Sequence, residues 1–357
     1  MRILHVVAGE KWTGIAAVVH DWTRALVEAG VEAQFAFVGG SPLARRIAGP
    51  GWVRPLLSRP HGVRGTLQDL PALRRTLVRE RFDLVHAHSS HDHALAVAAA
   101  ATLKAPVRPR VVRTLHHLRH ARPDRFMRAV FRRTAAFTFA NREIAEVSGV
   151  PGPVQLPLVD PVLFSPRTGP RPAGPGALLP AVGLVVGTVG KLALGRGHEE
   201  AIAAAAPLAD GVVLLHVGKG ERLAELRGAA ERLGTSARNI WAGYQDEALA
   251  DFYRSMDVFL FTASGSQQGQ RAILEAMATG LPVVALPVPG VRDLVADGVE
   301  GFVSEDVPSA TAALRRLVAE PELRARMGEA ARRRALGFGG AGFASAARDF
   351  YGRVRSA

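Results

Sequence analysis

Residues 257–286 read DVFLFTASGSQQGQRAILEAMATGLPVVAL, and this stretch decides the fold class. The run 258–261 is apolar throughout, as expected of a strand buried on both faces of a parallel sheet. Apolar residues then recur at helical spacing over 273–278, and Gly280 ends that helix before the apolar run 283–286. The stretch therefore predicts a strand, a short helix and a second, parallel strand.

An anion site is expected where this helix begins. Gly269 lies just before the helix, where a residue without a side chain lets the backbone approach a ligand. The N–H groups of Gln270 and Arg271 would point at that ligand, and the helix dipole and the Arg271 charge favour an anion. Glu275, one turn later, could accept two hydrogen bonds from ribose hydroxyls. These groups predict a nucleotide diphosphate site; the alternative is a plain buried helix of an α/β protein.

The run 269–285 resembles the donor-site signature of family 4 glycosyltransferases, which are retaining enzymes of the GT-B fold. In that signature an acidic residue is followed, after seven residues, by Glu-Ala-Met-Ala-x-Gly-x-Pro-Val-Val. Glu275 matches the second acidic residue, which in the family binds the ribose of the donor. Gln267 occupies the first acidic position, whose side chain contacts the transferred sugar in the family. This departure leaves the identity of the sugar open.

A second motif of the family lies at 190–198, which reads GKLALGRGH. The family has Gly-Arg-Leu, a short loop and Lys-Gly there, and its two cations clamp the donor diphosphate. Here Lys191 and Arg196 occupy these positions with the two cations interchanged. Such charges stabilise a diphosphate as it leaves, although Lys191 cannot form the two-pronged contact of an arginine. Solvated loop cations are the alternative, and Tyr244 lies where the family borders the nucleotide base.

Four features of the first half carry further predictions. The strand 3–7, the loop 8–14 and the helix that follows predict another βαβ unit. Gly14 would allow close approach at the helix start, or would simply form a turn. The loop resembles the glycine loop of the family, in which Thr13 here replaces one glycine. The strand 111–116 resembles the one that carries a histidine near the transferred sugar, and His116 is the matching residue; a surface histidine is the alternative.

Histidines cluster after residue 83, at His86, His88, His91 and His93. His86 and His88 would share one face of a strand, but no Asp, Glu or His partner with ligand spacing is evident, so we predict no metal site. The segment resembles the Asp-x-Val-His-x-His strand end of the family. That likeness places His88 and His91 on the acceptor side.

The composition of the chain indicates its class of protein, its number of domains and its compartment. A chain of 357 residues with 48% hydrophobic and 22% charged residues predicts a soluble protein of two domains. The chain has no cysteine, which excludes thiol nucleophiles, disulfides and Cys-based zinc sites and fits a reducing compartment. The apolar run at the N-terminus is too short for a signal peptide, and prolines and glycines interrupt the uncharged window 172–190. A cytoplasmic location is therefore expected.

The formal charge of +13 is concentrated in residues 1–165, which hold 23 Lys and Arg against 12 Asp and Glu. Such a surface could face anionic lipid, nucleic acid or an acidic acceptor. No nucleic-acid motif is present, so that partner is not expected. A basic amphipathic helix is predicted over 122–133. It is either a solvated face over the core or a peripheral contact with the inner face of the cell membrane.

The sequence thus predicts a GT-B protein with two Rossmann-like, doubly wound α/β domains and a cleft between them. Residues 1–165 would form the acceptor-side domain, 166–180 the linker and 181–342 the donor-binding domain, with a last helix over about 343–357 crossing back. The resemblance implies transfer of a sugar with retention, from a nucleotide diphosphate sugar to a glycan, lipid-linked or small-molecule hydroxyl, for instance in cell-envelope lipopolysaccharide. His116 and Gln267 are the catalytic candidates.

No metal or other cofactor is expected, because the chain has no Asp-x-Asp pair to hold one at the diphosphate. A nucleotide-sugar epimerase of the same fold and a non-catalytic nucleotide-sugar binder remain open. A dinucleotide oxidoreductase would need Gly-x-Gly-x-x-Gly, which residues 8–14 do not provide.

Overall fold

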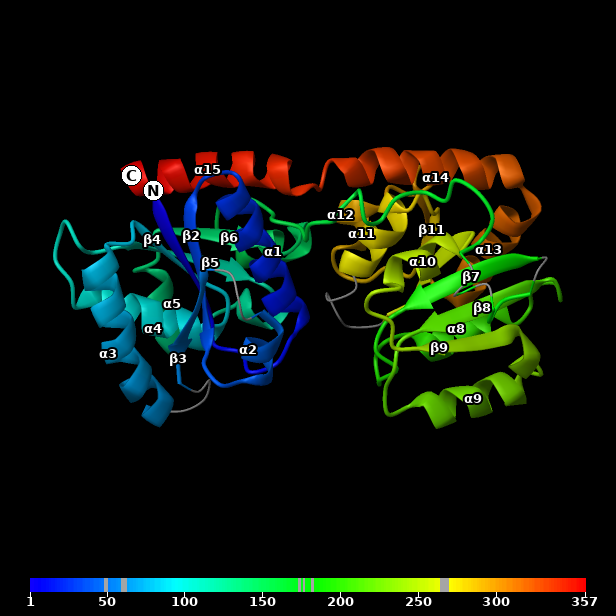
Figure 1. Cartoon of the computed structure of the whole chain (residues 1–357), viewed down its shortest axis with the longest axis horizontal. Helices are drawn as coiled ribbons and strands as arrows, with labels where there is room; N and C mark the ends of the chain where they lie inside the picture. Colours follow the sequence, from blue (N-terminus) through cyan, green and yellow to red (C-terminus); the bar gives the residue numbers. More distant parts are fainter. Residues whose placement is uncertain (48–50, 59–62, 173–174, 176, 181–182, 264–269) are drawn as a thin grey trace. The chain divides into compact units, whose positions relative to one another are not determined.

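The computed structural model describes residues 1–47, 51–58, 63–172, 175, 177–180, 183–263 and 270–357. They divide into two compact units, Met1–Leu158 with Gly340–Ala357 (unit 1) and Val159–Gly339 (unit 2). Each unit contains a six-stranded sheet whose paired strands all run parallel (Figure 1). The predicted α/β class with two doubly wound domains is confirmed.

The sheet of unit 1 has the strand order β3-β2-β1-β4-β5-β6. Its strands are β1 (Arg2–Val7), β2 (Glu32–Val38), β3 (Val53–Leu57), β4 (Leu84–Ala87), β5 (Arg110–Leu115) and β6 (Ala136–Phe139). Its helices are α1 (Gly14–Glu28), α2 (Pro42–Ile47), α3 (Val63–Glu80), α4 (Ser90–Ala101), α5 (Arg125–Phe131), α6 (Arg142–Ser148) and α15 (Gly340–Ser356). Helices α3 and α4 cover one face of the sheet, and α1 and α15 cover the other.

The sheet of unit 2 has the order β12-β11-β10-β7-β8-β9. Its strands are β7 (Leu184–Val189), β8 (Val212–Val217), β9 (Asn239–Gly243), β10 (Val258–Phe261), β11 (Val283–Ala285) and β12 (Gly301–Val303). Its helices are α8 (His198–Ala205), α9 (Leu223–Arg232), α10 (Leu249–Arg254), α11 (Gln270–Ala278), α12 (Val291–Leu294), α13 (Val307–Ala319) and α14 (Pro321–Leu336). The strand–helix–strand unit predicted from residues 257–286 is confirmed.

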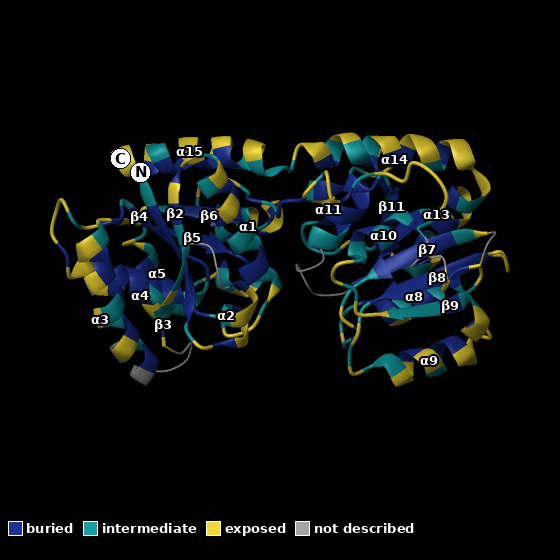
Figure 2. Ribbon diagram, in the orientation of Figure 1, coloured by how far each residue is buried: buried dark blue, intermediate teal, exposed yellow. Residues whose placement is uncertain are grey.

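Both sheets are buried between layers of helices, and the helices expose their outer faces (Figure 2). In unit 2, α8, α9 and α13 pack on one face of the sheet. On the other face, Tyr253 of α10 packs against Phe259 of β10. These buried strands explain the unbroken apolar runs of the sequence, because side chains on both faces are covered.

The segment expected to link two domains is attached to unit 2. The division falls between Leu158 and Val159, ahead of the predicted linker 166–180. Within the predicted linker, Arg171 Nη2 lies 2.8 Å from Asp257 Oδ2, and Arg167 Nη1 donates a 3.2 Å hydrogen bond to the carbonyl of Arg254. Directly ahead of it, Arg332 donates 2.8 and 2.9 Å hydrogen bonds to the carbonyls of Phe164 and Pro161. Arginine side chains therefore fasten this segment, which composition alone did not reveal.

Two predicted helices have different limits. The helix expected over 122–133 is the shorter α5, because the carboxylate of Asp124 caps it by accepting a hydrogen bond from Met127 N. The last helix begins at Gly340 and belongs to unit 1, where Tyr351 packs with Ile3 and Leu26. Within the described ranges, no helix has the length and apolar character to cross a membrane.

Candidate functional site

The strand order of unit 2 locates a candidate ligand site. The chain runs from β7 outward to β9 and then returns to place β10 on the other side of β7. In open parallel sheets, ligands bind at such a reversal, beyond the carboxyl ends of the two strands. Loop 190–197, which follows β7, lies there, and α11 follows β10. Both sequence motifs of the donor site therefore belong to this reversal point.

Gly197 packs loop 190–197 against the end of β10. Its φ is +75°, and a Cβ atom there would lie 2.0 Å from the carbonyl oxygen of Thr262. The hydroxyl of Thr262 donates a 2.5 Å hydrogen bond to the carbonyl of Gly197. Only a glycine permits this backbone and this approach, so the loop position depends on the glycine of the motif.

Lys191 lies on the surface of this loop region. Its Nζ forms a 2.9 Å ion pair with Glu221, and both side chains are more than half exposed. Arg196 occupies the other end of the loop, where its N–H closes a turn onto the carbonyl of Ala193. The structure thus places both predicted cations in the one loop after β7, with Lys191 held by a weak, solvent-screened partner.

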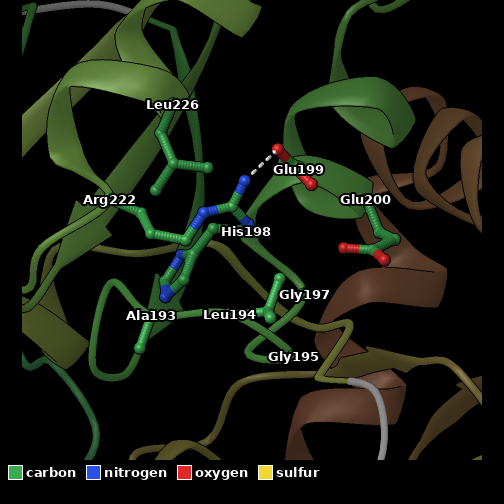
Figure 3. A pocket seen from close by; sticks show the side chains of 9 residues that line it. All are labelled: Ala193, Leu194, Gly195, Gly197, His198, Glu199, Glu200, Arg222 and Leu226. Carbon is green, nitrogen blue, oxygen red and sulfur yellow. Dashed lines mark hydrogen bonds and ion pairs between the residues drawn. The ribbon is translucent and has the colours of Figure 1, made fainter.

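A pocket of about 300 Å³ opens beside the same loop (Figure 3). Its wall includes His198, Glu199 and Arg222, none of which the sequence singled out. Arg222 Nη2 lies 2.8 Å from Glu199 Oε1. Burial lowers the pKa of His198 to about 4, so this imidazole is neutral at pH 7. In the sequence, only its position directly after the motif glycine Gly197, which precedes the first residue of α8, could have pointed to His198 as a site residue.

Glu275 is held in place by groups from two helices. Only 5% of the residue is exposed. Its Oε1 accepts a 2.9 Å hydrogen bond from Nε of Arg271, and its Oε2 accepts a 3.0 Å bond from the hydroxyl of Tyr253 in α10. Burial and the neighbouring carboxylate raise the pKa of Tyr253 well above its ordinary value. The sequence predicted Glu275 and Arg271 but missed Tyr253.

Three other donor-site predictions have different outcomes. Gln267 and Gly269 lie outside the described residues. Gln270 is the first residue of α11 and is buried, and its Nε2 has no partner in the described part of the chain. Tyr244 follows the edge strand β9, is half exposed, and lies under the ammonium of Lys219 at 4.7 Å from the ring centre.

Unit 1 has its own reversal point, between β1 and β4. Gly14 is the first residue of α1, after an N-cap formed by Thr13. Asp92 joins the two loops at this point: Oδ1 accepts a 3.0 Å bond from Ala8 N, and Oδ2 accepts a 2.9 Å bond from Ser89 N. Asp92 was not predicted as a site residue. Its buried carboxylate therefore holds the predicted glycine loop 8–14 beside the segment that follows β4, which contains His88.

The two predicted acceptor-side histidines, His88 and His91, and the catalytic candidate His116 lie around this point. His88 and His116 follow β4 and β5, are 1% and 6% exposed, and are joined by a 3.2 Å contact between His88 Nδ1 and His116 Nε2. The surface alternative for His116 is therefore wrong. His91 lies in the first turn of α4, where its Nε2 is buried without a partner in the described ranges.

A third imidazole lies beside His86 and His88, which corrects the expectation that no partner is available. His5 is the register partner of His86 on the neighbouring strand, and ligand nitrogens of the three residues lie within 4.8 Å of one another. Most of these nitrogens already have partners, however. His86 faces Tyr351 Oη and Thr114 Oγ1, each at 2.7 Å. Among the described residues, every ring nitrogen of the three histidines except His5 Nε2 has a hydrogen-bond partner.

Two known protein families match this chain, one in each unit. The family described as Glycosyl transferases group 1 matches residues 179–334, and the family described as Glycosyltransferase Family 4 matches residues 12–147. The lipopolysaccharide core biosynthesis glycosyltransferase LpsE of Rhizobium meliloti is 34% identical over 152 residues, 42% of this chain and 44% of the relative. A D-inositol 3-phosphate glycosyltransferase of Streptomyces griseus is 46% identical over 107 residues, 29% of this chain and 22% of the relative. The matched segments thus span less than half of either relative.

Solved structures share the fold over nearly the whole chain. HepE of Anabaena, crystallised with UDP, superimposes with a TM-score of 0.83 over 99% of this chain and 100% of that protein, at 18% identity. Sucrose-phosphate synthase of Thermosynechococcus elongatus superimposes with a TM-score of 0.76 over 100% of both chains, at 19% identity. At these identities the likeness concerns the fold.

Proposed function

Because the chain belongs to the family 4 glycosyltransferases and has their GT-B fold, we propose that it transfers a sugar from a nucleotide diphosphate sugar to a hydroxyl acceptor. One observation carries the proposal. Loop 190–197 with its two cations follows β7, and α11 with Glu275 follows β10, so both belong to the reversal point of unit 2. That is where an open parallel sheet binds a nucleotide.

The donor would be held by charge and by hydrogen bonds. Lys191, Arg196 and the N–H groups that begin α11 bind the two phosphates, and Glu275 accepts hydrogen bonds from the ribose. As the glycosidic bond breaks, negative charge grows on the diphosphate, and fixed positive groups stabilise it. These groups make a divalent metal unnecessary. UDP is the first nucleotide to test, because HepE, which shares the fold, was crystallised with UDP.

The transfer would retain the anomeric configuration. Among the residues assigned to the site, none is placed as a covalent nucleophile. We therefore propose departure assisted by the diphosphate and attack by the acceptor on the same face of the sugar. His116 would contact the transferred sugar, Gln267 would replace the usual acidic residue, and Gly14, His88 and His91 would lie on the acceptor side.

A lipid-linked or glycan acceptor of the cell envelope is the class we favour. Support comes from LpsE, whose name places it in lipopolysaccharide core biosynthesis. In this chain α5 exposes Arg125 and Arg128, followed by exposed Arg132, and Phe126 between them is 67% exposed. Basic side chains around an exposed aromatic ring suit an anionic membrane surface. We propose a cytoplasmic protein with peripheral contact through this segment.

A donor panel tests the proposal. UDP-, GDP- and ADP-sugars are incubated with the protein in EDTA, and the released nucleotide and the anomer of the released sugar are measured. We expect one nucleotide class to be hydrolysed slowly with retention. Inversion would overturn the proposed stereochemistry, and a requirement for Mg²⁺ would overturn metal independence. If the protein neither binds nor hydrolyses any of the donors, the proposed function is wrong.

A further inference from the structure

Three buried histidines of unit 1 form a continuous hydrogen-bonded chain. His5 Nδ1 lies 3.0 Å from His88 Nε2, and His88 Nδ1 lies 3.2 Å from His116 Nε2. The three residues belong to the neighbouring strands β1, β4 and β5 or directly follow them. Their exposed fractions rise from 0% at His5 to 1% at His88 and 6% at His116. The chain therefore runs from the core of unit 1 toward its surface.

All three imidazoles are neutral at pH 7. Burial lowers the pKa of His5 to about 3 and holds the pKa values of His88 and His116 well below their ordinary range. A neutral imidazole has one N–H donor and one acceptor nitrogen. A chain of N–H···N bonds then has two consistent arrangements, in which every ring carries its proton either on Nδ1 or on Nε2.

The inner end of the chain discriminates between the two arrangements. Nε2 of His5 is buried and has no hydrogen-bond partner among the described residues. If the protons were on Nε2, an N–H group would be buried there unpaired. If they are on Nδ1, only an acceptor lone pair is unused. Unpaired buried N–H groups are the rarer case in folded proteins, so protons on Nδ1 are favoured.

Two neighbouring rings, His86 and Trp22, have their hydrogen-bonding nitrogens engaged outside this row of three histidines. His86 lies beside His5 and His88, but its two nitrogens are occupied by Tyr351 Oη and Thr114 Oγ1. The indole of Trp22 lies beside the rings of His88 and His116, with centroids 6.0 and 6.3 Å away. The indole N–H is itself held by the carbonyl of Leu156 at 3.2 Å. The orientation of the imidazoles is therefore set by close packing as well as by hydrogen bonds.

We infer that His5 and His88 are positioning residues that fix His116 as the Nδ1–H tautomer. His116 then presents a hydrogen-bond donor to its ligand and does not act as a general base. The identity of that ligand rests on the proposed function, in which it is an oxygen atom of the sugar or the acceptor. The tautomer itself follows from the three rings alone.

Nitrogen NMR of the protein labelled with ¹⁵N in its histidine rings reads the tautomer directly and needs no turnover. The His116 signals are identified by their loss in His116→Asn. We expect Nδ1 of His116 to carry the proton and Nε2 to be an acceptor. A proton on Nε2, a doubly protonated ring, or signals of His5 and His88 that change when EDTA removes a bound metal would each overturn the inference.

Two pairs of variants separate positioning from packing. Asparagine places an amide N–H near the position of Nδ1, so His5→Asn should keep the His116 tautomer, whereas His5→Leu should give a mixture. For the same reason His116→Asn should retain at least about tenfold more kcat/KM than His116→Gln, whose amide lies near the position of Nε2. Equal losses in the two His116 variants would overturn the donor role. If no sugar donor reacts at all, the proposed function fails, and the NMR measurement still decides the tautomer.

Discussion

Tyr253 Oη lies 3.0 Å from Oε2 of Glu275, and both residues are buried. Because Arg271 Nε engages the other carboxylate oxygen at 2.9 Å, groups from α10 and α11 hold the carboxylate on both sides. A carboxylate oriented in this way can receive ribose hydroxyls without first reorganising. The orientation of the carboxylate that we propose binds ribose is therefore set in part by Tyr253, a residue that no sequence motif marks.

Replacing Glu275 by Gln should weaken nucleotide binding by about 1.5–3 kcal/mol, roughly 10- to 150-fold, because a charged hydrogen-bond acceptor is lost. Titration calorimetry measures the effect. Tyr253→Phe is the matched control, since it keeps the carboxylate and removes one of its supports. It should lower the unfolding free energy by about 1 kcal/mol and change nucleotide affinity less. Equal affinities of wild type and Glu275→Gln would contradict the ribose role.

Removing either cation of loop 190–197 should slow the chemical step. Lys191→Met and Arg196→Met should each lower kcat by about 100-fold, the usual loss for one group that stabilises developing negative charge. Lys191→Arg keeps the charge and should keep most of the activity. Arg227→Gln removes an exposed charge of α9 in the same unit and serves as the control. The diphosphate role is wrong if all four variants have the same kcat.

Gly197→Ala should both destabilise unit 2 and reduce activity. A Cβ atom would clash with the carbonyl of Thr262 at 2.0 Å, and φ is +75°. A loss of at least about 1–3 kcal/mol is expected in urea unfolding. Gly228→Ala is the control, because it lies within α9 and its new Cβ would meet nothing closer than Arg232 Nη1 at 3.5 Å. That change should stabilise by about 0.5–1 kcal/mol.

As the pH is lowered, the free energy of unfolding should begin to fall near pH 6.5, well above the pH at which carboxylates titrate. Burial lowers the pKa values of His5, His93 and His216 from 6.5 to about 3. Below pH 6.5 the unfolded chain binds protons that the folded chain does not, so stability falls as pH falls. Each residue contributes a slope of about 1.4 kcal/mol per pH unit. His216→Asn should reduce the slope measured by urea unfolding between pH 6 and about 4, and an unchanged slope would show that His216 does not titrate as expected.

Binding to anionic vesicles should depend on three exposed arginines. Changing Arg125, Arg128 and Arg132 together to Gln should weaken binding by about 3 kcal/mol, or roughly 100-fold, in a vesicle sedimentation assay. The matched control changes the exposed arginines of unit 2 at positions 227, 326 and 333. Binding that survives the first triple change, or is lost equally in the second, would count against a membrane contact through α5.

The sequence predicted those features that are encoded in short contiguous stretches. The apolar runs 258–261 and 283–286 identified buried parallel strands because both faces of each strand are covered. Glu275 and Arg271 were found because one helix sets their spacing. Tyr253 was missed because it lies in α10, which precedes β10 in the sequence, whereas Glu275 lies in α11, which follows β10. No spacing rule relates its hydroxyl to the carboxylate that it supports.

Contacts that depend on sheet order could not be predicted either. His5 and His88 are 83 positions apart, and only the pairing of β1 with β4 brings their nitrogens within 3.0 Å. The same holds for the predicted linker 166–180, because its proline and glycine content did not reveal that it is attached to unit 2. Arg171 anchors it to Asp257, which is distant in sequence.

The central claim is that loop 190–197 and Glu275 bind a nucleotide diphosphate without a metal. Titration calorimetry with UDP, GDP and ADP in EDTA tests it most directly. We predict saturable one-to-one binding of at least one of them to the wild-type protein, and binding at least tenfold weaker both in Glu275→Gln and in the double variant Lys191→Met, Arg196→Met. Absence of binding by all three nucleotides, or equal affinity in the variants, would contradict the claim.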